Sequence, residues 1–229
     1  MVEEAAALAS RLKHRLIKKD WTISTAESCT GGMISSLLTD ISGASAWFKQ
    51  GWIVYSNESK MRELGVESSA FDEGGYGAVS HKVAVQMARG ARYKSGSNIS
   101  IAVTGIAGPS GSSEDKEVGR VHLAVIAEDY FLVRRMDFGD NDRLDNKRSF
   151  ASFALRLALE AIDRLDDGLK KETSLSSDPA GVKTGEDPDG QSLLGTDEWE
   201  GGISWGSEKK TVSQSLKKID LASLIDWDE

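Results

Sequence analysis

The sequence predicts an α/β fold, a layered sandwich in which helices cover a mixed β-sheet. Strand-like and helix-like runs alternate along residues 1–165, which is typical of this class. Two strand-like runs, 118–127 and 131–138, are joined by only residues 128–130, so they predict a hairpin and an antiparallel pair within the sheet. Residues 166–229 are rich in Gly, Ser, Asp and Glu without periodicity, so we expect a mostly disordered acidic tail after the domain.

The start of the chain is predicted to contribute two helices and one strand. Apolar residues recur at three- and four-residue spacing along residues 3–19 and 33–41, which is the period of a helix. Between them, residues 21–26 alternate bulky apolar and hydroxyl side chains, which is the period of a half-buried strand. Residues 42–45 form a loop. The first strand therefore turns into the second helix within residues 27–32.

The middle of the chain is predicted to supply a strand and two capped helices. Residues 52–55 favour a strand. Ser56 is suited to cap a following helix, which Gly65 ends. After a Gly- and Ser-rich loop over residues 67–79, Ser80 is placed to cap the next helix.

The second half of the domain is predicted to complete the sheet and to end on its longest helix. Residues 98–103 form an apolar strand that ends at Thr104, and residues 106–116 form a Gly- and Ser-containing loop. The two hairpin strands follow this loop. Residues 144–165 place apolar side chains on one face and predict the strongest helix of the chain.

The charge of the chain is concentrated in its tail. The sequence has 28 basic and 36 acidic residues, for a net charge of −8. Residues 166–229 hold 15 acidic and 7 basic residues, so the tail carries the whole excess. Binding to a phosphate backbone depends on clustered Lys and Arg. We therefore expect no nucleic-acid partner.

Cysteine usage and hydropathy exclude several further classes. The single cysteine, Cys29, rules out an intramolecular disulfide and a multi-cysteine zinc site, and we expect neither a metal nor a cofactor. No apolar run approaches the ~20 residues that a membrane helix needs. Residues 1–4 lack the basic start of a signal peptide. These features predict a cytoplasmic protein that does not contact a membrane.

A candidate nucleophile lies where the first strand turns into a helix. Ser28 and Thr30 flank Cys29 at this point, and Gly31 and Gly32 permit a tight turn and close approach of a ligand. Free N–H groups at a helix start favour negative charge, so a hydroxyl beside them is suited to acyl transfer. The alternative interpretation is a Ser/Thr helix cap with glycines for close packing.

The histidines give little support to a Ser-His-Asp triad. His14, His81 and His122 all fall in predicted helices, caps or strands, and none lies in a loop with an acidic partner. Lys60 offers another base, because it lies one helical turn after a strand end, near Tyr55. The alternative for a lysine in a first helical turn is simple solvation.

A second Gly- and Ser-containing loop, residues 104–113, offers backbone N–H groups and hydroxyls of the kind that bind phosphate or carboxylate. An ordinary turn is the alternative. Arg143, Lys147 and Arg148 are grouped around the start of the last helix. They either hold a phosphate or offset the aspartates nearby.

Five motifs in order resemble one family. They are Thr25-Ala26-Glu27-Ser28-Cys29-Thr30-Gly31-Gly32, Gly43-Ala44-Ser45-Ala46-Trp47-Phe48, Tyr55-Ser56-Asn57-Glu58-Ser59-Lys60, Gly77-Ala78-Val79-Ser80 and Thr104-Gly105-Ile106-Ala107-Gly108-Pro109. Together they are similar to the C-terminal domain of the competence/damage-inducible protein CinA, a family of nicotinamide-nucleotide amidohydrolases. The resemblance covers residues 5–165.

The resemblance implies hydrolysis of nicotinamide mononucleotide to nicotinic acid mononucleotide and ammonia, as part of pyridine nucleotide recycling. It implies that Ser28 is the nucleophile, that Lys60 is the base and that Tyr55 supports them by hydrogen bonding. The substrate contacts that we expect from the motifs are Thr30, Gly31, Gly32, Thr104, Gly105, Gly108 and Arg143, of which Arg143 would hold the nucleotide phosphate.

The chain departs from the family pattern at two places in its body. Ser110 stands where the family usually has Asp after Gly-Pro, and residues 138–143 space Arg143 differently from the usual Phe-x-Gly-Asp-Arg. These departures keep open a second hypothesis, a catalytically weak nucleotide-binding module that acts through a protein partner of the tail. A third hypothesis makes Cys29 the nucleophile.

The tail has no counterpart in the family pattern. Trp199 and Trp205 stand in an acidic setting, where they either anchor an unknown protein partner or dock on the chain's own core. Residues 212–227 place apolar side chains at helical spacing and predict a short helix. We also expect a homo-oligomer, with a dimer as one form.

Overall fold

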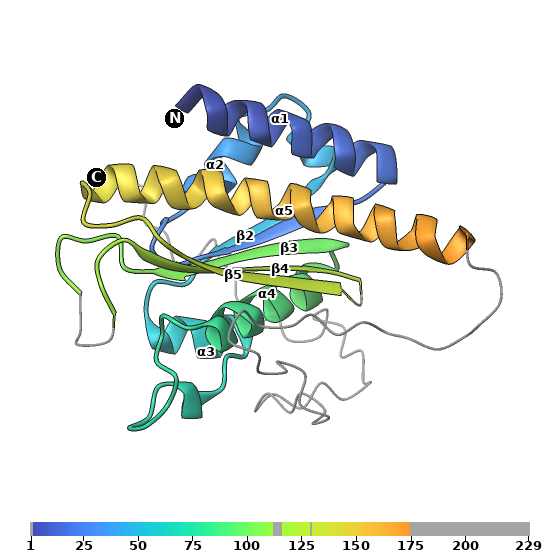
Figure 1. Cartoon of the computed structure of the whole chain (residues 1–229). Helices are drawn as coiled ribbons and strands as arrows, with labels where there is room; N and C mark the ends of the chain where they lie inside the picture. The colour runs from blue at the N-terminus through green and yellow to red at the C-terminus, as the bar shows by residue number, and fades with distance from the viewer. Residues whose placement is uncertain (1, 112–115, 129, 175–229) are drawn as a thin grey trace, which may run out of the picture.

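The fold was taken from a computed structural model, which describes residues 2–111, 116–128 and 130–174. In these residues a five-stranded sheet lies between two layers of helices, which confirms the predicted α/β sandwich (Figure 1). The predicted disordered tail began at residue 166, but residues 166–174 are helical, so this part of the prediction is wrong. The rest of the tail, with the short helix expected over residues 212–227, lies outside the described residues.

The sheet is mixed, with the strand order β2-β1-β3-β4-β5. Strand β1 (Ile23–Glu27) pairs in parallel with β2 (Phe48–Ile53) on one side and with β3 (Ile99–Gly105) on the other. Strands β4 (Arg120–Ala127) and β5 (Tyr130–Asp137) continue the sheet in antiparallel pairs. The predicted hairpin between the last two strands is confirmed.

Strand β1 lies inside the sheet, second from its edge, and the prediction that it is half-buried is wrong. All five of its residues are buried, because strands flank it on both sides and helices cover both faces. Its hydroxyls find partners inside the protein. The Ser24 and Ser97 hydroxyl oxygens lie 2.9 Å apart, and those of Thr25 and Ser35 lie 2.7 Å apart. Alternating hydroxyls therefore mark internal hydrogen bonds here rather than a solvated face.

The boundaries of β2 also differ from the prediction. It covers Phe48–Ile53 rather than residues 52–55, so Tyr55 lies in the loop after the strand. This strand is at the edge of the sheet, and most of its side chains are partly or fully exposed. Residues 48–51 therefore lack the apolar pattern of a buried strand, which is why periodicity missed them.

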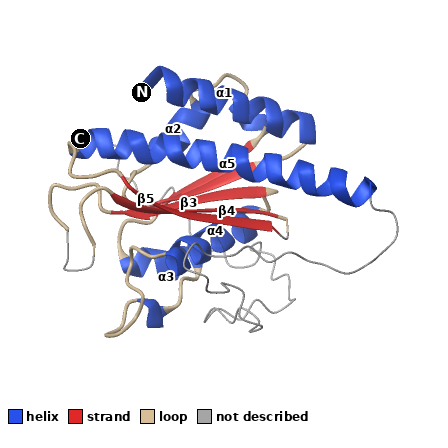
Figure 2. Cartoon of the chain, viewed as in Figure 1, coloured by secondary structure: helices blue, strands red, loops and turns tan. Residues whose placement is uncertain are grey.

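Helices α1 (Val2–Lys19), α2 (Met33–Thr39) and α5 (Arg143–Ser174) cover one face of the sheet (Figure 2). The predicted apolar stripe of α1 is buried in this layer. Helix α5 continues past residue 165, the predicted end. Asp166 on this extension forms ion pairs with Arg15 and Lys19 of α1, so tertiary contacts support the added turn.

Helices α3 (Asn57–Leu64) and α4 (His81–Ser95) cover the opposite face. Both predicted caps are confirmed, because the Ser56 and Ser80 hydroxyl oxygens accept backbone N–H groups of the first turns. Gly65 ends α3 with φ 68°, a backbone conformation that suits glycine. Short 3-10 turns, Ala44–Ala46 and Ser68–Ala70, lie in the connecting loops.

His122 of β4 is buried against the start of α4. Its ring lies edge-on to the ring of His81, with the centroids 4.6 Å apart. Burial, and to a smaller extent the charges nearby, lower the pKa of His122 from 6.5 to about 3. The groups that repel a proton on His122 are His81, Arg135, Arg120 and Lys116. The folded protein therefore holds His122 neutral.

This neutral histidine is expected to make the protein sensitive to acid. Above pH 6.5 His122 is neutral in the unfolded chain as well, so folding is not opposed by a proton on this residue and stability is at its full value. As the pH falls from there toward about 3, only the unfolded chain takes up the proton, so stability is lost. At about pH 4.5 the loss is roughly 3 kcal/mol. Urea unfolding at about pH 7.5 and 4.5 measures it.

The substitution His122→Gln is expected to remove this part of the pH dependence, because glutamine does not titrate. The matched control is His14→Gln, since His14 is exposed on α1. An equal acid-induced loss of stability in wild type and His122→Gln would contradict the assignment.

Candidate functional site

A cleft of about 240 Å³ opens at the carboxyl ends of the parallel strands β1 and β3. This is the edge at which open α/β sheets bind ligands. Its walls come from the loops after β1, β2 and β3, the start of α3, the segment before α4, and the first residue of α5. The lining residues are Ser28, Cys29, Tyr55, Asn57, Lys60, Ala78, Val79, Thr104, Gly105, Ile106, Ala107, Ser110, Gly111 and Arg143.

Most of the predicted site residues meet in this cleft. The three expected for chemistry line it together: Ser28 from the loop after β1, Tyr55 from the loop after β2, and Lys60 from the start of α3. The expected substrate contacts divide into two groups. Those that line the cleft are Thr104, Gly105 and Arg143, and those outside its lining are Thr30, Gly31, Gly32 and Gly108.

Ser28 directly follows β1, and two hydrogen bonds of its backbone groups fix its position. Its N–H donates to the Val103 carbonyl at 3.1 Å, and its carbonyl accepts the Gly31 N–H at 3.0 Å. Gly31 and Gly32 both have positive φ angles, 60° and 94°, which an ordinary side chain would strain. The predicted tight turn is therefore present, and it directs the chain from the central strand into α2.

The residue before Ser28 is one that sequence reasoning missed. Glu27 is fully buried, and its carboxylate accepts five hydrogen bonds. One oxygen accepts the Thr30 hydroxyl at 2.7 Å and the N–H groups of Gly32 and Ile34 at 3.0 and 3.1 Å. The other accepts the N–H and the hydroxyl of Ser35, both at 2.7 Å. Gly32 is the N-cap residue of α2 and has no side chain, so the Glu27 carboxylate supplies the acceptor for the first N–H groups of this helix.

This carboxylate corrects the expectation that the free N–H groups of α2 face a ligand. Those of Gly32, Ile34 and Ser35 already donate to Glu27. The Thr30 side chain is fully buried against the same carboxylate. A carboxylate is stabilised at a helix start, and here that carboxylate is the side chain of Glu27 rather than a ligand. The signal in the sequence that could have indicated this role is an acidic residue at the end of a strand, just before a helix start.

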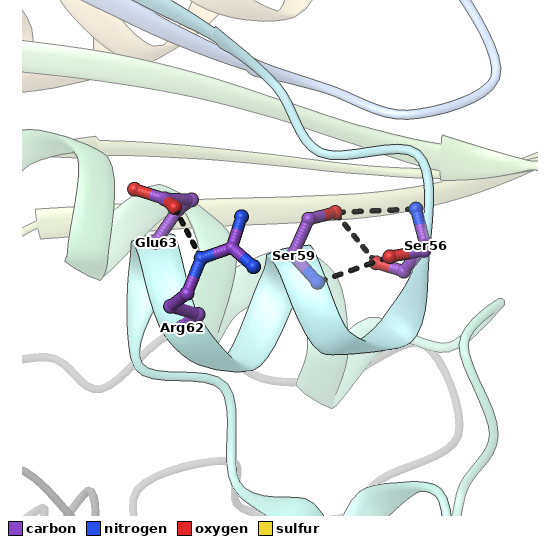
Figure 3. A network of polar contacts seen from close by, with 4 residues as sticks. All are labelled: Ser56, Ser59, Arg62 and Glu63. Atoms are coloured by element: carbon purple, nitrogen blue, oxygen red, sulfur yellow. Dashed lines mark hydrogen bonds and ion pairs between the residues drawn. The ribbon is translucent and has the colours of Figure 1, made fainter.

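Lys60 is positioned by the start of α3. The Ser56 and Ser59 side chains each accept the backbone N–H of the other, which fixes the first turn (Figure 3). Arg62 and Glu63, drawn in the same view, pair on the solvent side of this helix. The Lys60 side chain turns the other way and is only 2% exposed. The alternative of a solvated lysine is therefore wrong.

Burial changes the acid–base behaviour of Lys60. Its ammonium donates to the carbonyls of Tyr55 and Ser56 at the long distances of 3.4 and 3.5 Å. Burial lowers the pKa of Lys60 below 10.5, and its electrostatic interactions with Cys29 and Glu58 offset this only in part. A lysine whose charge is destabilised in this way is suited to act as a base.

The hydrogen bonds of Lys60 in this structure go to backbone carbonyls rather than to Ser28. Both side chains nevertheless line the same cleft. Catalytic hydrogen bonds are often long or incomplete without substrate and tighten in the complex. The sequence predicted that the two groups share a site, and the structure places them there without a direct bond.

Arg143 links two loops at the mouth of the cleft by hydrogen bonds. It donates to the Tyr55 hydroxyl and to the Gly108 carbonyl, both at 2.5 Å. Tyr55 is 57% exposed, so this contact lies at the surface. Gly108 thus reaches the site through its carbonyl, although it does not line the cleft. The start of α5 is thereby linked to the loops after β2 and β3.

Thr104 and Gly105 form the wall of the cleft at the end of β3. The buried Thr104 hydroxyl donates to the Ala78 carbonyl at 2.7 Å and so holds the segment before α4. At Gly105 a side chain would meet the Arg120 carbonyl oxygen at 2.6 Å, so only glycine fits. The Thr104 hydroxyl is therefore engaged in the protein.

Cys29 lines the cleft but is a poor nucleophile. Its side chain is buried, and burial raises the pKa of the thiol to about 12. The thiolate is the reactive form of cysteine, so such a thiol is inert near neutral pH. These properties disfavour the hypothesis that Cys29 attacks the substrate.

Within residues 2–111, 116–128 and 130–174, no three His, Cys, Asp or Glu side chains are grouped so as to hold a metal ion. None of the helices in this part of the chain combines the length and apolar character needed to cross a membrane.

The fold and the cleft define a small α/β domain with a hydroxyl and a buried amine at the carboxyl edge of its sheet. Residues 5–162 match the CinA C-terminal domain. The chain belongs to this family, which confirms the resemblance seen in the sequence.

Relatives and solved structures agree with this assignment. A CinA-like protein of Geotalea daltonii is 49% identical over 132 residues, which are 57% of this chain and 32% of that protein. One of Desulforapulum autotrophicum is 40% identical over 152 residues, 66% of this chain and 36% of that protein. The chain thus spans about a third of the length of these curated relatives.

The structural similarity extends over more than nine tenths of each of two solved structures. The competence/damage inducible protein CihA from Agrobacterium tumefaciens has a TM-score of 0.67 at 41% identity, covering 70% of this chain and 96% of that chain. A CinA superfamily protein from Enterobacter cloacae has a TM-score of 0.64 at 30% identity, covering 70% and 92%.

Proposed function

We propose that this protein is a nicotinamide mononucleotide deamidase that uses Ser28 and Lys60. The observation that carries the proposal is the burial of Lys60 in the same cleft as Ser28, with its pKa lowered. A neutral amine beside a hydroxyl can take up the proton that the hydroxyl loses on attack. Membership of the CinA family supports the same reaction class.

In the proposed mechanism the Ser28 oxygen attacks the carboxamide carbon while Lys60 accepts the hydroxyl proton. The tetrahedral intermediate carries a negative oxygen, which then expels ammonia as Lys60 returns the proton. Water hydrolyses the resulting ester and releases the carboxylate product. Ser28 therefore bears the covalent intermediate, and Lys60 transfers the proton in both halves.

The negative oxygen of the intermediate needs donors other than those bound by Glu27. The backbone N–H groups of Cys29 and Thr30 interact with the Cys29 sulfur and favour its anion, although burial dominates. They lie next to Ser28 in the chain. We assign them as the oxyanion donors, a role in which loss of one donor typically costs on the order of 100- to 1000-fold in rate.

Arg143 is proposed to hold the phosphate of the nucleotide. Its guanidinium is exposed at the mouth of the cleft and can form two parallel bonds to a phosphate. In the present structure it donates to Tyr55 and Gly108 instead. Substrate binding would therefore exchange at least one of these contacts for the phosphate.

The test of this proposal is ammonia release from nicotinamide mononucleotide by the purified protein. Ser28→Ala is expected to lower kcat by at least about a thousandfold, because the covalent route is lost. Cys29→Ala is the matched control and should retain activity, since the thiol is inert. Folded wild-type protein that releases no ammonia would overturn the proposal.

The pH dependence of the reaction is expected to report the lowered pKa of Lys60. Only the neutral amine accepts a proton, so kcat/KM should rise with pH through the pKa of Lys60. Because burial lowers this pKa below 10.5, the rise should occur at lower pH than an ordinary lysine would produce. An unchanged profile in Cys29→Ala would exclude the thiol as its source, and a rise centred at or above 10.5 would contradict the assignment.

A nucleotide-binding module is the second candidate function, and the bonding of Lys60 to carbonyls rather than to Ser28 favours it. It predicts that nicotinamide mononucleotide stabilises the protein against heat without release of ammonia. The proposed homo-oligomer, the cytoplasmic location and a protein partner for residues 166–229 remain predictions.

A further inference from the structure

A second cavity lies at the opposite end of the sheet from the candidate cleft. It has a volume of about 500 Å³ and is bounded by the last turns of α4, the segment leading into β3, and β4. The candidate cleft is at the end of β3, whereas this cavity is at its start. The lining residues are Arg89, Arg92, Tyr93, Gly96, Ser97, Asn98 and Ile126.

Arg89 is the unusual member of this lining. It is half-buried, and burial alone lowers the pKa of its guanidinium. Other arginines of the domain, such as Arg15 and Arg120, are paired with carboxylates. Among the residues that the structure describes, Arg89 has no such partner, and no acidic side chain lines the cavity. Withdrawing a cation from water without a counter-charge is unfavourable, and a bound anion would relieve it.

Arg92 brings a second guanidinium to the same face. It follows Arg89 by three positions on α4, so the two side chains are neighbours on the helix surface. Its Nε donates to the Asn98 carbonyl at 3.0 Å, which orients the group. A cation in a last helical turn is favoured by the helix dipole, which accounts for Arg92 but not for Arg89, a turn earlier.

Asn98 adds an uncharged donor to the cavity. Its side-chain oxygen accepts the N–H and the hydroxyl of Thr22, at 2.8 and 3.1 Å. The amide NH₂ is therefore the end of Asn98 that is left to donate to a ligand. Two guanidinium groups and an amide NH₂ all present donors, which is the chemistry that recognises several oxygens of one anion.

We propose that this cavity binds a small anion with two or more charged oxygens, phosphate or carboxylate, held between Arg89 and Arg92. An alternative explanation is that the aliphatic part of the Arg89 side chain simply packs against the protein surface. It does not explain a guanidinium without a carboxylate beside a cavity of this size. The site is separate from the proposed active site and does not depend on it.

The test is calorimetric titration of the full chain with inorganic pyrophosphate and, separately, with citrate at low ionic strength. Wild type is expected to bind at least one of them, and Arg89→Gln should weaken that binding at least about tenfold, as expected for a lost charge-assisted pair. Binding of pyrophosphate alone would identify phosphate, and binding of citrate alone would identify carboxylate. Arg92→Gln is the second variant, should Arg89→Gln fail to fold.

Two controls separate this site from the rest of the molecule. Arg11→Gln removes an equal charge from an exposed position on α1 and should leave the affinity unchanged. Arg143→Gln removes the phosphate contact proposed for the candidate cleft, and the binding that depends on Arg89 should remain in this variant. Absence of binding by wild type, or binding lost in Arg143→Gln but kept in Arg89→Gln and Arg92→Gln, would overturn the proposal.

Discussion

Lys60→Met is expected to lower the rate of ammonia release from nicotinamide mononucleotide by about 100- to 10,000-fold, the usual contribution of a general base. Methionine matches the length of the lysine stem but cannot accept a proton. Because Lys60 is 2% exposed within the candidate cleft, water has little access to replace it as the base. The loss should therefore appear in kcat rather than in KM alone.

The same substitution is expected to leave the fold at least as stable as wild type. The pKa of Lys60 is lowered in the folded state, so at neutral pH the unfolded chain holds its proton more tightly. The charged lysine therefore opposes folding below its usual pKa of 10.5, and an apolar replacement removes that cost. The Ser56 carbonyl still accepts the Ser59 hydroxyl and the Lys60 backbone N–H.

Urea unfolding at neutral pH and an ammonia assay on the same preparations measure both effects. The matched control is Lys18→Met, because Lys18 is exposed on α1 and should change neither quantity. A large fall in stability together with the fall in rate would indicate that Lys60 has a structural role instead of a catalytic one.

Glu27→Ala is expected to destabilise the protein by about 3 to 5 kcal/mol, the range seen when one partner of a buried charged network is removed. The five donors that now converge on its carboxylate would lose their acceptor inside the protein. Three of them are N–H groups at the start of α2, which Gly32 as the N-terminal cap residue cannot satisfy with a side chain. Unsatisfied buried donors cost more than the bond itself contributes.

Glu27→Gln refines this test because it keeps one acceptor oxygen of the same shape. Its NH₂ group would face donors, so an intermediate loss of stability is expected. Glu117→Ala serves as the control, since Glu117 is exposed and should leave the unfolding midpoint unchanged. A Glu27→Ala protein as stable as wild type would show that water replaces the carboxylate.

Ser28 follows Glu27 directly, so the same network also positions the proposed nucleophile. The carboxylate fixes the start of α2, and the Gly31 N–H donates to the Ser28 carbonyl within that turn. Loss of activity in Glu27→Gln, beyond the loss of folded protein, is the consequence that we expect. The residue is therefore a positioning residue and not one that contacts the substrate.

The sequence by itself determined the class of fold, most of the elements and the placement of Ser28, Tyr55 and Lys60 in one cleft. Helical period, capping by Ser56 and Ser80, and the short link between the last two strands depend on residues close together in the chain. The ordered motifs identified Ser28 and Lys60 as members of one site. Helix period, helix caps and tight turns can be predicted from the sequence because each depends on residues that are close together in the chain.

Only the tertiary structure decided which of these groups are buried and what they bind. Strand β1 was predicted to be half-buried and is fully buried, because the neighbouring strands β2 and β3 and the helices α4 and α5 come from distant parts of the chain. The Glu27 carboxylate accepts the N–H groups of α2 that were expected to face a ligand. Lys60 is buried, and burial lowers the pKa of its amine. Burial and pKa depend on contacts across the whole fold, which spacing along the chain does not reveal.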